Sequence, residues 1–355
     1  MKILFVYYLP SGGMDTLNRQ RCQALQNIGI KCHLLYFRNG SGIQNIRNIP
    51  TFMTNNDQEI KQLIKRGNYS VIIVCSDYLF LKKLRDFGYK GKIIYEVQGL
   101  GEEVTVNQTF QNIKKQIIPY VNGILYPNTS HLKKYIQQHF PMLKKYCFHN
   151  CFDTKTFSYR SLPVQQSPII GWVGRLERNK NWQAFLTISH HLIKINPAIQ
   201  IWMFHDASLA TPEEKTKFEQ MVNQLQLQNH LTTYSNISHN QMANHYSMIG
   251  DSGGFLCSTS ITEGFGYAVV EAMACRCPVL ATDSDGVKSF IIHNRTGKFF
   301  KNPTNAVNQA KELMTNSKLR EELRSNAQKH IQVNFQPSRY AQNFSKMLRE
   351  LRVSK

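Results

Sequence analysis

Two glutamates, Glu263 and Glu271, frame the segment of the sequence most suited to chemistry. They stand in an E-x7-E pattern, with Gly264 and Gly266 between them, where an apolar strand-like run gives way to a helix-like run. Glycines allow close backbone approach and unusual φ angles. A helix that starts near residue 267 would offer free N–H groups and a positive dipole end to a diphosphate. The carboxylates could accept hydrogen bonds from sugar hydroxyls, each worth roughly 1.5–3 kcal/mol when charge-assisted.

Two cations follow another strand-like run. Gly174 allows a turn after the predicted strand at residues 169–173, and Arg175 and Lys180 follow it. A guanidinium fork and an ammonium point charge suit a diphosphate leaving group. Negative charge grows on such a group as a glycosidic bond breaks, so cations there stabilise the transition state more than the ground state. A divalent metal becomes unnecessary, and the sequence contains no D-x-D cluster to hold one.

Strand-like and helix-like runs alternate along the first part of the chain, which predicts a doubly wound α/β domain with a parallel sheet. The predicted strands are residues 2–8, 31–36, 71–75, 92–97 and 123–126. The predicted helices are residues 16–28, 57–65, 79–87, 109–121 and 130–139.

The same alternation restarts after a polar stretch at 158–167 and predicts a second open α/β sheet. Its expected strands are 169–173, 200–204, 231–234, 254–258 and 278–282. Its expected helices are 181–195, 212–225, 239–248, 267–274, 304–314 and 319–334. We therefore predict domains at 1–160 and 161–336, with a last helix at about 337–355 that crosses back to the first domain. Two such domains in tandem face a cleft between the carboxyl ends of their strands, where ligands of open α/β sheets bind.

These segments resemble the signature of the retaining glycosyltransferases of family 4, which have the two-Rossmann GT-B fold. The E-x7-E spacing and its flanking text are similar almost residue by residue, and Gly174-Arg175-Leu176 with Lys180 is similar to the phosphate-binding Arg and Lys of the family. Residues 150–157 resemble its interdomain segment, and Gly12-Gly13 resembles its N-terminal glycine loop beside the donor phosphates.

The resemblance implies roles for individual residues. Glu263 would bind donor-sugar hydroxyls near the reacting carbon, and Glu271 would hold the nucleotide ribose. Arg175 and Lys180 would neutralise the diphosphate. The remaining donor-binding positions that the resemblance implies are Gly12, Gly13, Gly174, Gly264, Phe265 and Gly266, with the backbone of the last two contacting sugar and phosphate.

Two positions depart from the family pattern. Gln98 falls where the family often has a histidine near the reacting centre; it could hydrogen-bond a sugar hydroxyl but cannot act as an acid or base. Retaining transfer can use a donor phosphate oxygen as base, so this departure does not exclude activity. Gln98 stays among the catalytic candidates as a residue that could bind a sugar hydroxyl. His205-Asp206-Ala207 replaces the more usual glycine-rich turn near the base, which leaves the base open.

Composition limits the location and the partners. The 355 residues carry a net charge of +20, eight cysteines without a C-x-x-C pair, and no apolar run of the ~18 residues that span a bilayer. We expect free thiols in a reducing cytoplasm. A basic protein attracts polyanions. The pairs Lys114-Lys115, Lys133-Lys134 and Lys144-Lys145 lie among apolar residues, which suits an anionic membrane and equally suits a solvated helix face.

The sequence as a whole predicts a cytoplasmic, metal-independent transferase without a cofactor, with a peripheral place on the inner face of the membrane as a further option. It would move a sugar from a nucleotide-diphosphate donor to a glycan, lipid-linked or cell-envelope acceptor. Alternatives are another GT-B enzyme, such as a sugar-nucleotide epimerase, and a basic polyanion-binding protein. Nucleic acid is disfavoured because no nucleic-acid-binding motif is present. All three tryptophans, Trp172, Trp182 and Trp202, are predicted to be core residues.

Overall fold

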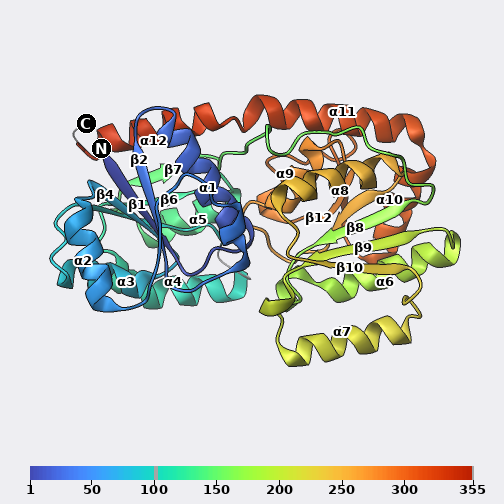
Figure 1. Ribbon diagram of the computed structural model, residues 1–355, viewed down its shortest axis with the longest axis horizontal. Helices are drawn as coiled ribbons and strands as arrows, with labels where there is room; N and C mark the ends of the chain where they lie inside the picture. Colours follow the sequence, from blue (N-terminus) through green and yellow to red (C-terminus); the bar gives the residue numbers. More distant parts are fainter. Residues whose placement is uncertain (100–102, 354–355) are drawn as a thin grey trace. The chain divides into compact units, whose positions relative to one another are not determined.

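The strands form two parallel sheets, each in its own unit of the chain (Figure 1). The structure is a computed structural model that describes residues 1–99 and 103–353. The first unit comprises Met1–Phe152 with Phe335–Lys355, and the second comprises Asp153–Asn334. Residues 153–160, assigned to the first domain from the sequence, pack on the second unit instead: Tyr159 Oη donates to Asp251 at 3.1 Å and the Arg160 N–H donates to Ser247 Oγ at 3.1 Å.

The sheet of the first unit has the strand order β3-β2-β1-β4-β5-β6-β7. The strands are β1 (Lys2–Tyr7), β2 (Lys31–Tyr36), β3 (Thr51–Met53), β4 (Val71–Cys75), β5 (Lys92–Glu96), β6 (Gly123–Tyr126) and β7 (Lys145–Cys147). All five residues of β4 are buried, as expected for a central parallel strand covered on both faces. The order reverses between β1 and β4, so the switch point of this sheet lies between those two strands.

Helices cover both faces of this sheet, with α1 and α12 on one side and α2, α3 and α4 on the other (Figure 1). The helices are α1 (Gly12–Gln26), α2 (Asp57–Gly67), α3 (Tyr78–Asp86), α4 (Glu103–Ile117), α5 (Ser130–His139) and α12 (Pro337–Glu350), with a 3-10 turn η1 (Ser41–Asn45). The last helix packs on α1 and reaches β1, where the Phe344 ring lies 6.1 Å from that of Phe5. It ends at Glu350, and residues 354–355 of the predicted final helix lie outside the described residues.

The sheet of the second unit has the order β10-β9-β8-β11-β12-β13. Its strands are β8 (Ile169–Val173), β9 (Gln200–His205), β10 (Leu231–Ser235), β11 (Phe255–Ser258), β12 (Val279–Thr282) and β13 (Lys298–Phe300). The chain runs outward from β8 to β10 and then returns to β11, so the switch point lies between β8 and β11. Ligands of open α/β sheets bind at the carboxyl ends of strands at such a point.

The helices of the second unit also lie on both faces of the sheet, with α8 and α9 on one and α6 on the other (Figure 1). They are α6 (Trp182–Ile195), α7 (Pro212–Gln224), α8 (His239–Asp251), α9 (Tyr267–Ala274), α10 (Pro303–Thr315) and α11 (Ser317–Asn334). Three 3-10 turns lie in loops: η2 (Arg178–Lys180), η3 (Ala207–Leu209) and η4 (Asp285–Val287). Trp172, Trp182 and Phe185 fill the core under α6.

Candidate functional site

A half-buried ion pair joins the two segments singled out in the sequence. Lys180 Nζ donates to Glu263 Oε1 at 2.5 Å, with 22% and 14% of the two side chains exposed. Lys180 follows β8 and Glu263 follows β11, and these neighbouring strands flank the switch point of the second sheet. The fold therefore brings together two residues that lie 83 positions apart in the chain, at the edge where ligands of such sheets bind.

Hydrogen bonds from neighbouring residues fix the two loops against each other. Asn179 Nδ2 donates to the Thr262 carbonyl at 3.1 Å, while Asn179 Oδ1 accepts from the Thr262 hydroxyl at 2.9 Å. The buried Thr259 hydroxyl donates to the Lys180 carbonyl at 2.9 Å and accepts from the Trp172 indole at 3.1 Å. These residues were not singled out from the sequence, because Asn and Thr in loops are common and only the fold reveals their partners. They hold the cation and the carboxylate at a set separation.

Two glycines let the Glu263 loop fold tightly. Gly266 precedes α9 with φ of +85°, a left-handed conformation that L side chains rarely adopt, and a Cβ there would lie 2.7 Å from Val287. Gly286, which was not identified from the sequence, touches the backbone of the loop, since a Cβ there would lie 2.2 Å from the Glu263 carbonyl oxygen. The left-handed backbone at Gly266 and the close backbone contact at Gly286 together fix the path of the loop that carries Glu263.

The first turn of α9 starts directly after this loop. The Phe265 side chain is buried, with its ring 4.9 Å from Tyr267 and 5.5 Å from Phe290, so only its backbone is left for a ligand. Gly264 and Gly266 flank it without side chains. The Val269 N–H already donates to the Gly266 carbonyl at 3.0 Å. The N–H groups of Tyr267 and Ala268, at the start of α9, lie at the positive end of the helix dipole. This end of the helix can accommodate an anion.

Glu271 lies inside α9 and is largely buried. Its Oε2 accepts a hydrogen bond from the Tyr246 hydroxyl of α8 at 3.0 Å. Burial, and next the Glu271 carboxylate, raise the pKa of Tyr246 well above its usual value, so the phenol stays a donor. The carboxylate is thereby held by the core of the second unit rather than by the Lys180–Glu263 pair.

Arg175 is the most exposed of the predicted site residues in the second unit. Its guanidinium donates to Glu177 Oε1 at 3.0 Å, and 55% of the side chain is exposed. Gly174, just before it, donates its N–H to the Phe204 carbonyl of β9 at 3.1 Å, which anchors the loop to the sheet. Arg175 thus lies at the same edge of the sheet as Lys180, with a largely exposed side chain that an anion can reach.

Gly12 and Gly13 are not in a loop before the helix, as the sequence had suggested, but form the first turn of α1. Ser11, in extended conformation, precedes them, and Gly12 has φ of +60°. No atom lies within 4 Å of where a Gly12 Cβ would stand. A short connection therefore joins the carboxyl end of β1 to the start of α1, and the space beside Gly12 is open.

Gln98 belongs to a polar network inside the first unit. Its amide nitrogen donates to Glu96 at 2.9 Å and to Asn150 at 3.2 Å, and its oxygen accepts from Asn150 at 2.7 Å. Glu96 in turn binds Arg21 through both carboxylate oxygens at 2.7 and 2.8 Å, and neither charge is exposed. Both amide protons of Gln98 are therefore used, so it can offer a sugar hydroxyl only an acceptor.

A second buried acid, Asp15, lies in the first turns of α1. Neither of its carboxylate oxygens has a hydrogen-bond partner within the described residues. Burial raises the pKa of Asp15 to about 7, although the Arg19 guanidinium opposes this shift. The charged groups of α1 are thus inside the protein: Asp15, Arg19 and Arg21 are all buried.

The loop predicted to lie near the base follows β9. His205 is the last residue of that strand, and Asp206 Oδ1 accepts the Ser208 N–H at 3.0 Å to cap the turn η3. Burial lowers the pKa of His205, so its imidazole is neutral at neutral pH. β9 neighbours β8, which puts this loop beside the one that carries Arg175.

Among residues 1–99 and 103–353, no group of three or more His, Cys, Asp or Glu side chains could hold a metal ion. In that same part of the chain, no helix is long and apolar enough to cross a membrane.

The family model described as "Glycosyl transferases group 1" matches residues 153–330, which is half of the chain. The chain belongs to the glycosyl transferases group 1. The match covers the second unit, including both loops of the Lys180–Glu263 pair.

Solved structures with GT-B architecture match this group 1 chain over nearly its whole length and show the same fold. Sucrose-phosphate synthase from Thermosynechococcus elongatus is 17% identical, with a TM-score of 0.81 and 99% of each chain covered. HepE from Anabaena, in complex with UDP-glucose, is 16% identical with a TM-score of 0.83, covering 99% of this chain and 100% of that one. The predicted fold class, two doubly wound α/β domains of the GT-B type, is confirmed.

Curated relatives match over shorter segments. A glycosyltransferase 1 domain-containing protein of Xenopus tropicalis is 38% identical over 79 residues, 22% of this chain and 23% of the frog protein. Trehalose synthase of Thermococcus litoralis is 23% identical over 185 residues, 52% of this chain and 44% of the enzyme. Both matches span less than half the length of the relative.

Proposed function

We propose that the protein is a retaining glycosyltransferase of family 4 that moves a sugar from a nucleotide-diphosphate donor to a glycan, lipid-linked or cell-envelope acceptor. The observation that carries the proposal is the Lys180–Glu263 pair at the switch point between β8 and β11, beside the start of α9. Membership of the glycosyl transferases group 1 supports the reaction class. The UDP-glucose complex of HepE supports the donor class.

The pair can serve donor and leaving group together. Lys180 carries three N–H donors and gives one to Glu263, which leaves two for phosphate oxygens. Glu263 has a second oxygen to accept hydrogen bonds from sugar hydroxyls. When the bond to the anomeric carbon breaks, negative charge builds on the diphosphate, and Lys180 stabilises that charge as it forms. Arg175 adds a second cation after leaving Glu177, at small cost because exposed ion pairs are worth about 0–1 kcal/mol.

The start of α9 would contact the same diphosphate through backbone N–H groups, as helix N-termini do for phosphates. Glu271, oriented by the Tyr246 hydroxyl, would accept both ribose hydroxyls. In unit 1, Gly12 and Gly13 offer a second helix start with free backbone donors. A donor phosphate oxygen would take the acceptor proton, because both amide protons of Gln98 are already bonded and it cannot act as a base.

These cations replace a metal in the proposal, and no cofactor is required besides the nucleotide sugar. We expect transfer to continue after treatment with EDTA, measured as release of nucleoside diphosphate. Strict dependence on added Mg²⁺ or Mn²⁺ would contradict the role given to Lys180 and Arg175.

A thermal-shift screen of UDP-, GDP-, ADP- and CMP-linked sugars tests the donor class. A ligand that binds only the folded state raises the unfolding temperature with concentration. We expect one nucleotide sugar to do so, followed by release of its nucleotide when acceptor is added. Stabilisation by nucleic acid alone, lost steeply with salt, would instead favour the polyanion-binding alternative.

The proposal places the protein in the cytoplasm, with exposed lysines available to an anionic membrane. The apolar residues near these lysines are mostly in the core: Phe110, Ile117, Tyr135, Phe140 and Tyr146 are buried. Lys115, Lys133 and Lys134 are exposed, and Met142 is 91% exposed. Any membrane contact would therefore be electrostatic, and we expect cosedimentation with phosphatidylglycerol vesicles that disappears in high salt. Salt-resistant binding would contradict it.

A further inference from the structure

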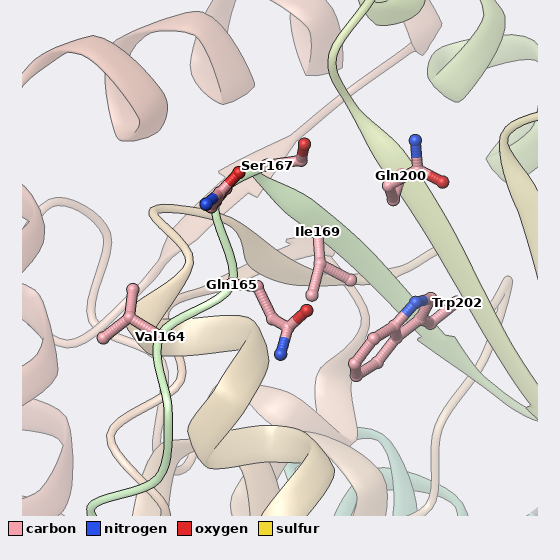
Figure 2. A pocket seen from close by; sticks show the side chains of 7 residues that line it. Val164, Gln165, Ser167, Ile169, Gln200 and Trp202 are labelled. Carbon is pink, nitrogen blue, oxygen red and sulfur yellow. The ribbon is translucent and has the colours of Figure 1, made fainter.

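A hollow of about 460 Å³ lies at the other end of the second sheet from the Lys180–Glu263 pair (Figure 2). Ile169 and Gln200, the first residues of β8 and β9, line it together with Trp202 and residues 164–167. Lys180 and Glu263 follow the carboxyl ends of β8 and β11. A five-residue strand is about 16 Å long at ~3.3 Å per residue, so this hollow is separate from the proposed donor site.

Trp202 differs from the other two tryptophans. Trp172 and Trp182 are 1% and 0% exposed, and their indole N–H groups donate to Thr259 and Glu214. Trp202, predicted to be core, is partly exposed, and its indole N–H makes no hydrogen bond within residues 1–99 and 103–353. Aromatic neighbours hold its ring in steep edge geometries: Phe204, Tyr234 and His245 have centroids at 5.6–6.4 Å. The indole is thus fixed in orientation and still accessible.

The polar groups round this indole are uncharged. Gln165, Gln166 and Gln200 supply three amides, and Ser167 a hydroxyl; the seven lining residues include no Lys, Arg, Asp, Glu or His. In the described part of the chain, none of these four side chains is hydrogen-bonded to another protein group. Figure 2 shows the Ile169 side chain between those of Gln165 and Gln200, with Trp202 to one side. Gln165 comes from the segment before β8 and Gln200 from β9.

This chemistry matches a neutral sugar ring. A pyranose has an apolar C–H face and a rim of hydroxyls that both donate and accept. An indole offers an apolar surface with one N–H donor, and each amide offers a donor and an acceptor. Small-molecule sites combine an aromatic wall with a few polar groups in volumes of about 300–1,000 Å³. A phosphate or sulfate would find no cation here.

We infer that this hollow is a binding subsite for an uncharged oligosaccharide, with one pyranose against Trp202 and its hydroxyls bonded to Gln165 and Gln200. The role of this subsite rests on the proposed function: it would retain a remote part of the glycan acceptor or product on the unit that holds the donor. The binding itself does not depend on that purpose.

Indole N–H resonances test the two sites separately. The chain has three tryptophans, so three signals in a ¹⁵N-labelled sample can be assigned with Trp→Phe variants. Maltohexaose, cellohexaose and chitohexaose are titrated in turn. We expect at least one to shift the Trp202 signal in a saturable manner without moving the Trp182 signal. UDP-glucose should shift Trp172, which bonds Thr259 beside the Lys180–Glu263 loops, and leave Trp202 unchanged.

Three glutamine variants, two inside the hollow and one outside it, test which side chains bind the saccharide. Gln165→Ala and Gln200→Ala should each weaken saccharide binding about 10-fold, the effect of one lost hydrogen bond, at about 1.4 kcal/mol per tenfold. Gln224→Ala, an exposed glutamine on α7 outside the hollow, should leave it unchanged.

Three results would overturn the inference. They are no saturable Trp202 shift with any of the three hexasaccharides, an equal loss in Gln224→Ala, and tighter binding of a heparin hexasaccharide at Trp202. A Trp202 response without any Trp172 response to nucleotide sugars would leave the subsite standing and count against the proposed donor site.

Discussion

The two sheets share one architecture, but the ion pairs at the carboxyl ends of β5 and of β8 and β11 differ in exposure. In the first unit, Arg21 and Glu96 are bonded to each other and fully buried at the end of β5. In the second, Lys180 and Glu263 form a pair that keeps 22% and 14% of its side chains exposed, and Arg175 keeps 55%. A fully buried pair of charges supports the scaffold, whereas a partly exposed pair retains capacity for a ligand. This contrast agrees with the proposal that the second unit binds the donor.

The largest effect should come from breaking the buried pair of the first unit. Arg21→Met leaves Glu96 charged and unpaired, and loss of one partner of a buried ion pair costs about 3–5 kcal/mol. Urea unfolding followed by circular dichroism measures this loss. All three tryptophans lie in the second unit, so their fluorescence reports the transition of that unit and should move less.

The double variant Arg21→Met with Glu96→Gln removes both charges and keeps an amide for Gln98. It should be more stable than the single variant. A cost below about 1 kcal/mol for Arg21→Met would show that this pair resembles an exposed one, which would break the comparison.

Asp15 should make the first unit less stable as the pH rises. Its pKa in the folded protein is about 7 against 3.8 as a model value, so the folded state binds the proton more tightly. The contribution of Asp15 to stability is therefore fully present below about pH 4 and is lost as the pH rises to about 7. Three pKa units correspond to at most about 4 kcal/mol at 1.36 kcal/mol per unit. Asp15→Asn should gain stability at pH 8 and little at pH 4.

The matched control is Asp57→Asn, an exposed acid of α2 paired with Lys83 in the same unit. The free energy of unfolding of both variants is measured from urea unfolding curves at pH 4, 6 and 8. If the stability of Asp15→Asn depended on pH in the same way as that of the unmodified protein, burial of Asp15 would not be a source of pH-dependent stability in the first unit.

Lys180→Ala and Glu263→Ala should each lower turnover about 10²-fold or more, near 2.7 kcal/mol in the barrier, without unfolding the protein. Both remove a contact proposed to strengthen as the diphosphate leaves. Lys217→Ala, from the exposed Lys217–Glu214 pair of the same unit, should retain full turnover. Near-normal rates for both site variants would remove the site assignment.

The sequence predicted the order of long elements because apolar runs of four to six residues alternate with helical periodicity. It missed β3, β7 and β13, each of three residues, which are too short to show a period. It placed the start of α1 at residue 16, because two glycines at 12–13 favour a turn over a helix. The burial of the polar residues of α1 could not be read from the sequence, because α12, which packs on that helix, lies far away along the chain.

The candidate site was predicted in part. Glycines and charges at the ends of two strands located Lys180 and Glu263, since parallel strands end at one edge of a sheet. Asn179, Thr259 and Gly286 could not be found, because their roles depend on contacts between loops about 80 residues apart or on backbone proximity. Trp202 was predicted to be core because tryptophans usually are, and its partial exposure beside the segment before β8 cannot be deduced from residue type.

Calorimetric titration of the four single variants Arg175→Ala, Lys180→Ala, Glu263→Ala and Glu271→Ala tests the central claim most directly. Each is titrated with a nucleotide sugar identified in the thermal screen and with its nucleoside diphosphate. We predict that Arg175, Lys180 and Glu271 variants bind both ligands more weakly, whereas Glu263→Ala loses affinity for the nucleotide sugar and binds the diphosphate normally. Unchanged affinities for both ligands in all four variants would contradict a shared donor site.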